Sequence, residues 1–342
     1  MGFETTTTEV IEGIDLDGTV AVVTGATTGL GRETARCLAA AGAHVVVCGR
    51  TAEKCRRAIE EIMAAHPDAS FDFEPFDLGD LATVRAGADA IVARYPEVSI
   101  LVNNAGVMFT PEGRTVDGFE TQFGTNHLGH FVFTNRLMPA LLAGAPSRVV
   151  NLSSAGHGFS DIHWDDPDYR TRPYDKFEAY GQSKTANILF TLGLEARHAD
   201  AGVRSNAVHP GMIMTDLARH MDAGDMEELG ARAAQREAAG NGGGLPGFKS
   251  VEQGAATSVF AAVAPALDGV GGRYLEDVDF GEPAAWAIDP ESAERLWALS
   301  ESLVGESFPM EVSLGPRGGP APVNRVPGGS TAHVALVPHV PS

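Results

Sequence analysis

Tyr180 and Lys184 lie four positions apart in the stretch EAYGQSKTAN, residues 178–187, which otherwise has the composition of a helix. Residues spaced by four lie on one face of an α-helix, so the two side chains can act on the same ligand. A phenol can donate or accept a proton, and an ammonium group one turn away favours its anion. The pair therefore indicates either a catalytic acid with a neighbouring cation or an ordinary polar face of a helix.

A glycine-rich turn follows the first predicted strand. The sequence TGATTGLGRETA, residues 24–35, places Gly25, Gly29 and Gly31 between an apolar run and a predicted helix. Glycine permits a tight turn and a close approach of the backbone to a pyrophosphate, whose charge is favoured at a helix N-terminus. This position at the start of a βαβ unit predicts a dinucleotide-binding turn, and a purely structural turn is the alternative.

The end of the second predicted strand indicates which dinucleotide is bound. The sequence there is CGR, residues 48–50, so Gly49 stands where an acidic residue would hydrogen-bond an adenosine ribose. No carboxylate repels a 2′-phosphate at this point, and Arg50 can pair with one through two N–H groups. These residues favour NADP(H) over NAD(H), and an Arg50 that simply faces solvent at a strand end is the alternative.

Short β-branched runs alternate with longer segments of helical pattern. Continuous apolar character predicts parallel strands covered on both faces, and the order of the elements predicts a doubly wound α/β fold. The predicted strands are residues 19–24, 44–48, 70–76, 99–103, 147–152 and 203–208, and the predicted helices are residues 30–42, 52–65, 80–94, 117–143, 178–200, 251–264 and 290–304.

Three segments depart from this alternation. Residues 155–177 are rich in Pro, Asp and aromatic residues and are predicted to form a long loop between a strand and a helix. Residues 212–250 combine a methionine-rich helical sequence with GNGGGLPG and are predicted to form a C-terminal lid. We expect one domain over residues 16–305, preceded by an extension of residues 1–15 and followed by a tail of residues 306–342.

Charge and composition restrict the class of partner. The 342 residues carry a formal net charge of −20, which repels phosphate backbones and anionic lipids and argues against nucleic acid and membrane partners. Three cysteines without Cys-x-x-Cys spacing are typical of free thiols in a reducing compartment, and no signal or membrane-spanning pattern is present. We therefore expect a cytoplasmic protein that acts on a small molecule. His163, Asp165, Asp166 and Asp168 are predicted to form a solvated loop without a metal ion.

Six motifs occur together in an order that resembles the short-chain dehydrogenase/reductases, and most closely their retinol-dehydrogenase-like branch. The motifs are TGATTGLG (24–31), NNAG (103–106), TNHLGHF (125–131), RVVNLSS (148–154), YGQSK (180–184) and HPGMIMT (209–215). The resemblance extends over residues 19 to about 215. It implies a single doubly wound domain of Rossmann type that forms a homodimer or homotetramer.

The resemblance also implies roles for individual residues. Tyr180 would be the acid/base, Lys184 would lower its pKa and hold the nicotinamide ribose, and Ser154 would bind the substrate oxygen. Asn126 would support a water-linked proton path. The residues implied in NADP(H) binding, besides Tyr180 and Lys184, are Gly25, Thr27, Thr28, Gly29, Leu30, Gly31, Arg50, Asp77, Leu78, Asn104, Ala105, Gly106, Pro210, Gly211, Ile213 and Thr215.

Together these residues predict an NADP(H)-dependent oxidoreductase that interconverts an alcohol and a carbonyl by hydride transfer. Negative charge that develops on the substrate oxygen can be stabilised by the Ser154 and Tyr180 hydroxyls. The resemblance and the apolar lid indicate an apolar substrate that is retinoid-, steroid- or polyketide-like. The alternatives are a non-catalytic NADP-binding sensor or scaffold, which the filled Asn, Ser, Tyr and Lys positions disfavour, and a nucleotide-sugar epimerase or dehydratase, which the glycine spacing disfavours.

Overall fold

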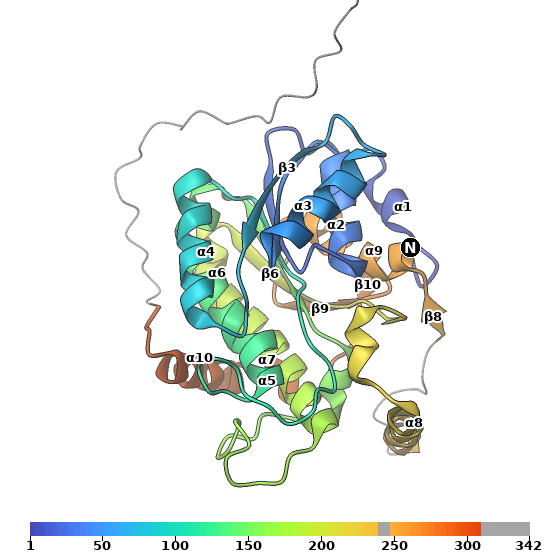
Figure 1. The fold of residues 1–342 in the computed structure, drawn as a ribbon, viewed down its shortest axis with the longest axis vertical. Helices are drawn as coiled ribbons and strands as arrows, with labels where there is room; N and C mark the ends of the chain where they lie inside the picture. Colours follow the sequence, from blue (N-terminus) through green and yellow to red (C-terminus); the bar gives the residue numbers. More distant parts are fainter. Residues whose placement is uncertain (239–246, 309–342) are drawn as a thin grey trace, which may run out of the picture.

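A computed structural model describes residues 1–238 and 247–308 of the chain (Figure 1). Within these residues the centre is an eight-stranded sheet in the order β10-β9-β6-β5-β4-β1-β2-β3. Each neighbouring pair is parallel except the short β10, which runs antiparallel to β9. The structure confirms the predicted single-domain, doubly wound parallel sheet.

The observed strands agree with the predicted ones to within one or two residues. The short β9 and β10 and a separate two-stranded sheet of β7 and β8 were not predicted, because runs of two to four residues carry no clear alternation. The strands are β1 Val20–Thr24, β2 His44–Gly49, β3 Ser70–Pro75, β4 Ile100–Asn103, β5 Ser147–Leu152, β6 Val203–His209, β7 Met212–Ile213, β8 Phe248–Lys249, β9 Arg273–Glu276 and β10 Asp279–Phe280.

The helices also follow the prediction, except that a short helix over Thr7–Ile11 was not predicted and one predicted helix is divided. The single helix predicted over residues 117–143 begins later and consists of α5, a π-helical segment η1 and α6 in succession. The α-helices are α1 Thr7–Ile11, α2 Gly29–Ala40, α3 Ala52–Met63, α4 Leu81–Arg94, α5 Thr121–Phe123, α6 Gly129–Ala143, α7 Lys176–His198, α8 Ala223–Ala238, α9 Val251–Val263 and α10 Pro290–Val304, and η1 is Gly124–Leu128.

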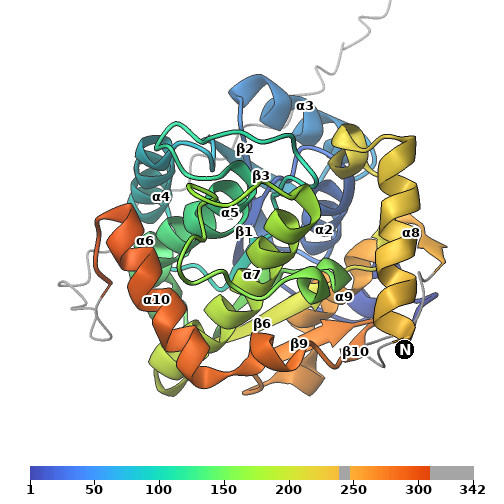
Figure 2. The ribbon, with the colours of Figure 1, turned by 90° about the horizontal axis from the view of Figure 1, so that it is seen from below.

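Helices cover both faces of the sheet, as Figures 1 and 2 show. Val22 belongs to the apolar core shared with α4, α6, α7 and α10, whereas its neighbour Val23 belongs to the core shared with α1, α2, α3 and α9. Successive side chains of a strand point to opposite faces, so both must be apolar when both faces are covered. This double burial explains the continuous apolar runs of the sequence.

Both ends of the described chain pack on this domain. In the predicted N-terminal extension, the Thr7 hydroxyl donates to the Glu33 carboxylate on α2 at 2.5 Å. After α10, Glu306 forms ion pairs of 2.8 Å with Arg85 and 2.7 Å with Arg136, so the packed fold extends a few residues past the predicted boundary at 305. Residues 309–342 of the predicted tail and 239–246 of the predicted lid lie outside the described residues. The predicted domain boundaries otherwise stay predictions.

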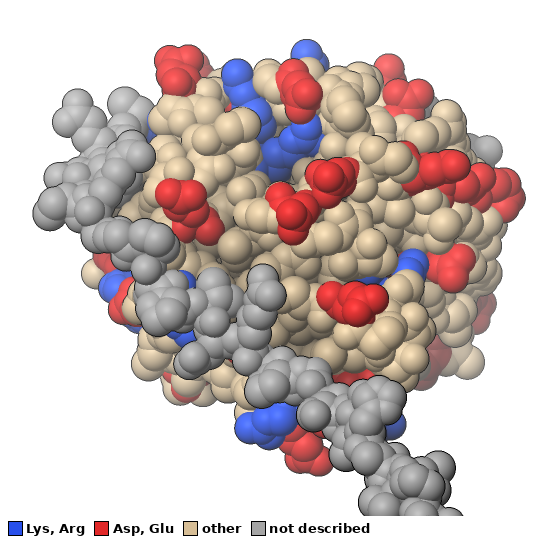
Figure 3. All heavy atoms as spheres, turned by 90° about the horizontal axis from the view of Figure 1, so that it is seen from above, with Lys and Arg blue, Asp and Glu red and all other residues tan. Residues whose placement is uncertain are grey.

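The sequence also predicted an acidic surface and free cysteines. On the face in Figure 3, Asp and Glu side chains are scattered in separate groups, and Lys and Arg side chains gather around one hollow. Cys37, Cys48 and Cys55 are free and buried. None of the helices in the described part of the chain has the length and hydropathy needed to cross a membrane.

Replacing Phe131 by Ala tests the core between the sheet and α10. The Phe131 ring is fully buried and lies 5.0 Å from the Trp297 ring and 5.4 Å from the Phe190 ring. We expect Phe131→Ala to lower the free energy of unfolding by about 3–5 kcal/mol, measured by urea denaturation. Phe280→Ala is the matched control, because Phe280 is 57% exposed, and it should cost less than about 0.5 kcal/mol. Equal losses in the two variants would contradict this assignment of the core.

Candidate active site

A cavity of about 790 Å³ opens at the carboxyl ends of the parallel strands. Thr24 at the end of β1, Leu152 at the end of β5 and His209 at the end of β6 contribute to its wall. The strand order reverses between β1 and β4, so the connections after these strands diverge and leave a crevice at that point. Its position is that of ligand sites in doubly wound sheets.

The structure brings nearly all of the predicted site residues to this cavity. Ser154, Tyr180 and Lys184 line it, whereas Asn126 lies behind the wall. The predicted dinucleotide-binding residues that line it are Gly25, Thr27, Thr28, Gly29, Leu30, Gly31, Arg50, Asp77, Leu78, Asn104, Ala105, Gly106, Pro210, Gly211, Ile213 and Thr215.

The glycine turn has the geometry that a pyrophosphate requires. Gly25 has φ +64°, and a Cβ there would lie 2.8 Å from the Ala105 Cα. A Cβ on Gly31 would lie 2.4 Å from the Gly25 carbonyl oxygen. Thr28 is the N-cap of α2 but its side chain makes no capping hydrogen bond, so the first N–H groups of the helix are open to an anion. The residues fit a dinucleotide phosphate.

Asn104 supports the same turn. Its side-chain amide donates to the Thr24 carbonyl oxygen at 2.8 Å, and its backbone N–H donates to the Thr24 hydroxyl at 2.9 Å. The connection after β4 is thereby fastened to the turn after β1. Besides lining the cavity, Asn104 fixes the distance between two of its walls.

The end of β2 leaves little space for a side chain at Gly49. A Cβ on Gly49 would lie 2.6 Å from the Thr27 Cγ2 and 3.1 Å from the Cys55 Sγ, so an acidic side chain does not fit at this position. Arg50 is exposed, and its guanidinium has no ion-pair partner in the part of the chain that the structure describes. A free cation beside a glycine suits a 2′-phosphate.

Tyr180 lies buried in the cavity wall. Its side chain is 3% exposed, and its ring packs with those of Phe109 and Phe177. Burial raises the pKa of Tyr180 to about 12, and its hydrogen bond with the Ser154 hydroxyl acts in the opposite direction. The Ser154 Oγ also accepts from the Gly156 N–H at 3.1 Å, which orients it.

Lys184 lies one turn along α7 from Tyr180, as the spacing predicts. Its ammonium donates to the Leu152 carbonyl oxygen at 3.0 Å and lies 5.6 Å from the centre of the Tyr180 ring. Burial lowers the pKa of Lys184 to about 8. Burial is the main cause of the raised Tyr180 pKa, and the predicted lowering of that pKa by Lys184 stays a prediction.

Asn126 lies in the π-helical segment η1 and supports the site from behind. Its amide accepts from the Val107 N–H at 2.8 Å and donates to the Val107 carbonyl oxygen at 2.9 Å. It also donates to the Ser183 hydroxyl at 2.9 Å, which in turn donates to the Tyr180 carbonyl oxygen at 2.8 Å. Asn126 thus links the loop after β4 to α7. Its role in a proton path stays a prediction.

The sequence indicated Met212, Met214, Met221 and Met226 as either pocket lining or core, and they line the cavity, but sequence reasoning missed the rest of the apolar wall. Its residues come from the loop after β4, the loop after β5 and the predicted lid, and single apolar residues in loops give no periodic signal. Met221 and Leu229 pack against the cluster that contains Tyr180. The apolar residues of the wall are Met108, Phe109, Phe159, Met212, Met214, Leu217, Met221, Met226, Leu229 and Phe248.

Ion pairs fasten the predicted lid to the start of α7. Arg232 on α8 donates to the Asp175 carboxylate at 2.7 Å, and Lys176 pairs with Asp225. Asp175 is also the N-cap of α7. These ion pairs connect the segment to the N-terminal end of α7, and its motion as a lid stays a prediction. Figure 2 shows α8 at the edge of the molecule.

The acidic residues of the inserted loop bind partners within the loop and in the segment before η1, and Asp168 is buried rather than solvated as predicted. The Asp166 carboxylate accepts from the N–H groups of Arg170 and Thr171, and Asp168 pairs with Arg114 at 3.2 Å. Among residues 1–238 and 247–308, no three His, Cys, Asp or Glu side chains are grouped so as to hold a metal ion.

Comparisons with known proteins agree with this geometry. Residues 19–225 match the family model described as short chain dehydrogenase. Human retinol dehydrogenase 13 is 41% identical over 298 residues, which cover 86% of this chain and 87% of that protein. A probable oxidoreductase of Streptomyces lividans is 44% identical over 297 residues, covering 83% and 97% of the two chains.

Solved structures are similar as well. An uncharacterised protein from Mycobacterium paratuberculosis has a TM-score of 0.70 at 33% identity, and the match covers 90% of this chain and all (100%) of that one. A gluconate 5-dehydrogenase from Burkholderia cenocepacia, solved in complex with NADP and tartrate, has a TM-score of 0.58 at 27% identity, covering 77% and 94%.

Replacing Asn126 by Ala tests the support behind the site. The variant leaves both polar backbone groups of Val107 without their partner, and each such buried group costs about 1–3 kcal/mol. We expect a loss of unfolding free energy in at least that range, measured by urea denaturation. Asn135→Ala is the matched control, because the buried Asn135 amide makes one hydrogen bond, to the Phe131 carbonyl oxygen, and should cost less. A larger loss of unfolding free energy in Asn135→Ala than in Asn126→Ala would refute this role.

Proposed function

The chain belongs to the short-chain dehydrogenase family, and from this premise we propose that it interconverts an alcohol and a carbonyl by hydride transfer with NADP(H). The observation that carries the proposal is the meeting of Ser154, Tyr180 and Lys184 in the cavity that also contains the glycine turn. An acid, a hydrogen-bond donor and a cation then surround one reacting oxygen.

The residues of the chain carry out the proton chemistry. The dinucleotide supplies or accepts the hydride when it is bound. Tyr180 holds its proton at neutral pH, because its pKa is raised to about 12, and donates it to the substrate oxygen during carbonyl reduction. The Ser154 hydroxyl donates a hydrogen bond to the same oxygen as negative charge develops there. Lys184 places a positive charge 5.6 Å from the centre of the Tyr180 ring.

Two features support NADP(H) rather than NAD(H). Gly49 leaves no space for an acidic side chain at the end of β2, and Arg50 presents an exposed guanidinium at the cavity. Several similar solved structures are described as complexes with NADP.

The apolar wall supports an apolar substrate. Methionine side chains from the lid segment can adapt to ligand shape, and the aromatic rings at the base of the cavity favour a flat or extended hydrocarbon body. Relatives that carry the name retinol dehydrogenase make retinoids the first compounds to test, with steroids and polyketide-like carbonyls next.

We propose a cytoplasmic homodimer or homotetramer. Cell fractionation would test the location, and light scattering would test the oligomeric state.

Removing the Tyr180 hydroxyl tests the reaction. With NADPH and a panel of retinoid, steroid, aliphatic and aryl carbonyls, we expect Tyr180→Phe to reduce kcat by about 10²–10⁴-fold while NADPH binding is kept. Absorbance at 340 nm follows turnover. Tyr95→Phe is the control, because its hydroxyl bonds Asp72 outside the cavity. Tight NADPH binding by the wild-type protein without turnover of any compound would favour the sensor or scaffold alternative.

Reversing the charge at Arg50 tests the choice of dinucleotide. We expect Arg50→Glu to weaken NADPH binding by about 10- to 100-fold, because a charge-assisted contact of about 1.5–3 kcal/mol is replaced by repulsion. The affinity for NADH should change little. Arg57→Glu on α3 is the matched control, because the Arg57 side chain is 80% exposed and pairs with Glu61. Equal effects on both dinucleotides, measured by calorimetry, would rule out the 2′-phosphate contact.

A further inference from the structure

Phe109 has a backbone conformation that is rare for a bulky residue. Its φ is +51°, in the left-handed region, and its side chain is 2% exposed. Such a conformation costs about 1–3 kcal/mol and persists only where the surroundings impose it. The ring lies edge-on to the Tyr180 ring, at 5.0 Å and 72°, and 4.4 Å from the Phe177 ring. The strained residue therefore contacts the proposed acid directly.

The buried Gln122 side chain contacts the backbone of Phe109. The Phe109 N–H donates to the Gln122 Oε1 at 2.8 Å, and the Gln122 side chain is fully buried. The Gln122 amide nitrogen donates to the Tyr174 hydroxyl at 3.0 Å and to the Lys176 carbonyl oxygen at 2.9 Å. Because these acceptors use both N–H groups of the amide, only its oxygen can face Phe109.

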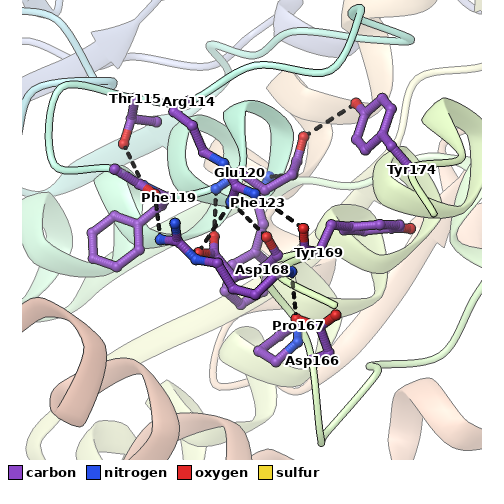
Figure 4. A network of polar contacts seen from close by, with 12 residues as sticks. Arg114, Thr115, Phe119, Glu120, Phe123, Asp166, Pro167, Asp168, Tyr169 and Tyr174 are labelled. Carbon is purple, nitrogen blue, oxygen red and sulfur yellow. Dashed lines mark hydrogen bonds and ion pairs between the residues drawn. The ribbon is translucent and has the colours of Figure 1, made fainter. Parts of the chain in front are cut away.

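Tyr174 belongs to the loop over residues 155–177, whose role the sequence left open. Besides accepting from Gln122, its hydroxyl lies 3.1 Å from the Thr110 carbonyl oxygen and 3.2 Å from the Glu120 carboxylate. Figure 4 shows the Tyr174 hydroxyl directed at Glu120. The inserted loop thereby reaches both ends of the segment between Phe109 and Gln122.

A second set of contacts fixes the inserted loop in place. The Asp168 carboxylate accepts from the Glu120 N–H, and Arg114 donates to the carbonyl oxygens of Asp168 and Tyr169 at 2.5 and 3.0 Å (Figure 4). The Tyr169 ring packs on the Tyr174 ring at 5.2 Å. Glu120 and Asp168 are both buried, so water competes little for these bonds.

We propose that Tyr174 and Gln122 are positioning residues that hold Phe109 in its left-handed conformation, so that the Phe109 ring fixes the orientation of the Tyr180 phenol. The inserted loop then acts on catalysis through three successive contacts without touching the substrate oxygen. The inference rests on the proposed function and assigns a role to residues that the catalytic motifs do not contain.

Three variants test the proposal in steady-state reduction with NADPH. Gln122→Leu should lower kcat by between about 10- and 100-fold, because a misoriented Tyr180 phenol transfers its proton less efficiently. The affinity for NADPH should be unchanged. Tyr174→Phe should lower kcat by about threefold or more, since one hydrogen bond to the amide is lost. Tyr169→Phe is the matched control from the same loop, because its hydroxyl makes only a 3.5 Å contact with the Asp175 carbonyl oxygen, and its kcat should match wild type.

A double-mutant cycle separates positioning from general support. If Gln122 acts through the Phe109 ring, Gln122→Leu combined with Phe109→Leu should lose no more kcat than Phe109→Leu alone. If the fold loss of kcat in the double variant equalled the product of the losses in the two single variants, the proposal would be overturned. It would also be overturned by kcat values within about twofold of wild type for Gln122→Leu and Tyr174→Phe, or by an equal loss in Tyr169→Phe. If Gln122→Leu does not fold, the comparison of kcat between Tyr174→Phe and Tyr169→Phe decides the question. Wild-type turnover that is absent, or that survives Tyr180→Phe, would instead overturn the proposed function.

Discussion

The hydrogen bond from the Lys184 ammonium to the Leu152 carbonyl oxygen, 3.0 Å long, fixes the position of α7 on the sheet. A buried cation is tolerated only where its donors are satisfied. The Asn187 amide donates to the same oxygen at 2.9 Å, and the Ser153 hydroxyl returns a bond to the Lys184 carbonyl oxygen at 2.9 Å. α7 therefore has one position along the end of β5, which brings Tyr180 to Ser154.

The cavity has two halves that are built by different means. The dinucleotide half is formed mainly by backbone, since the glycines at 25 and 31 bring main-chain atoms within van der Waals contact and the N-terminus of α2 presents its N–H groups. The half that we propose to hold the substrate is formed by side chains from loops and from α8. A single substitution can reshape the second half, whereas the first depends on backbone geometry that few substitutions preserve.

The features that could be predicted from the sequence are those with a local or periodic signal. The four-residue spacing of Tyr180 and Lys184, the glycine turn and the apolar strands each have one. The structure confirms the strands, and the similarity to known proteins confirms the family. The π-helical segment around Asn126 and the left-handed Phe109 were not predicted, because neither has a local or periodic signal in the sequence. Burial raises the pKa of Tyr180, and the spacing of residues in the sequence does not reveal burial.

The three buried thiols lie in consecutive elements of the dinucleotide half, Cys37 on α2, Cys48 on β2 and Cys55 on α3. Burial raises the pKa of Cys37 to about 12 and that of Cys55 to about 11, so neither presents a thiolate to reagents in the folded chain. Alkylation must then wait for local opening. The alkylation rate of these thiols therefore measures how often this part of the native protein opens. The same rate shows how far a bound dinucleotide slows that opening.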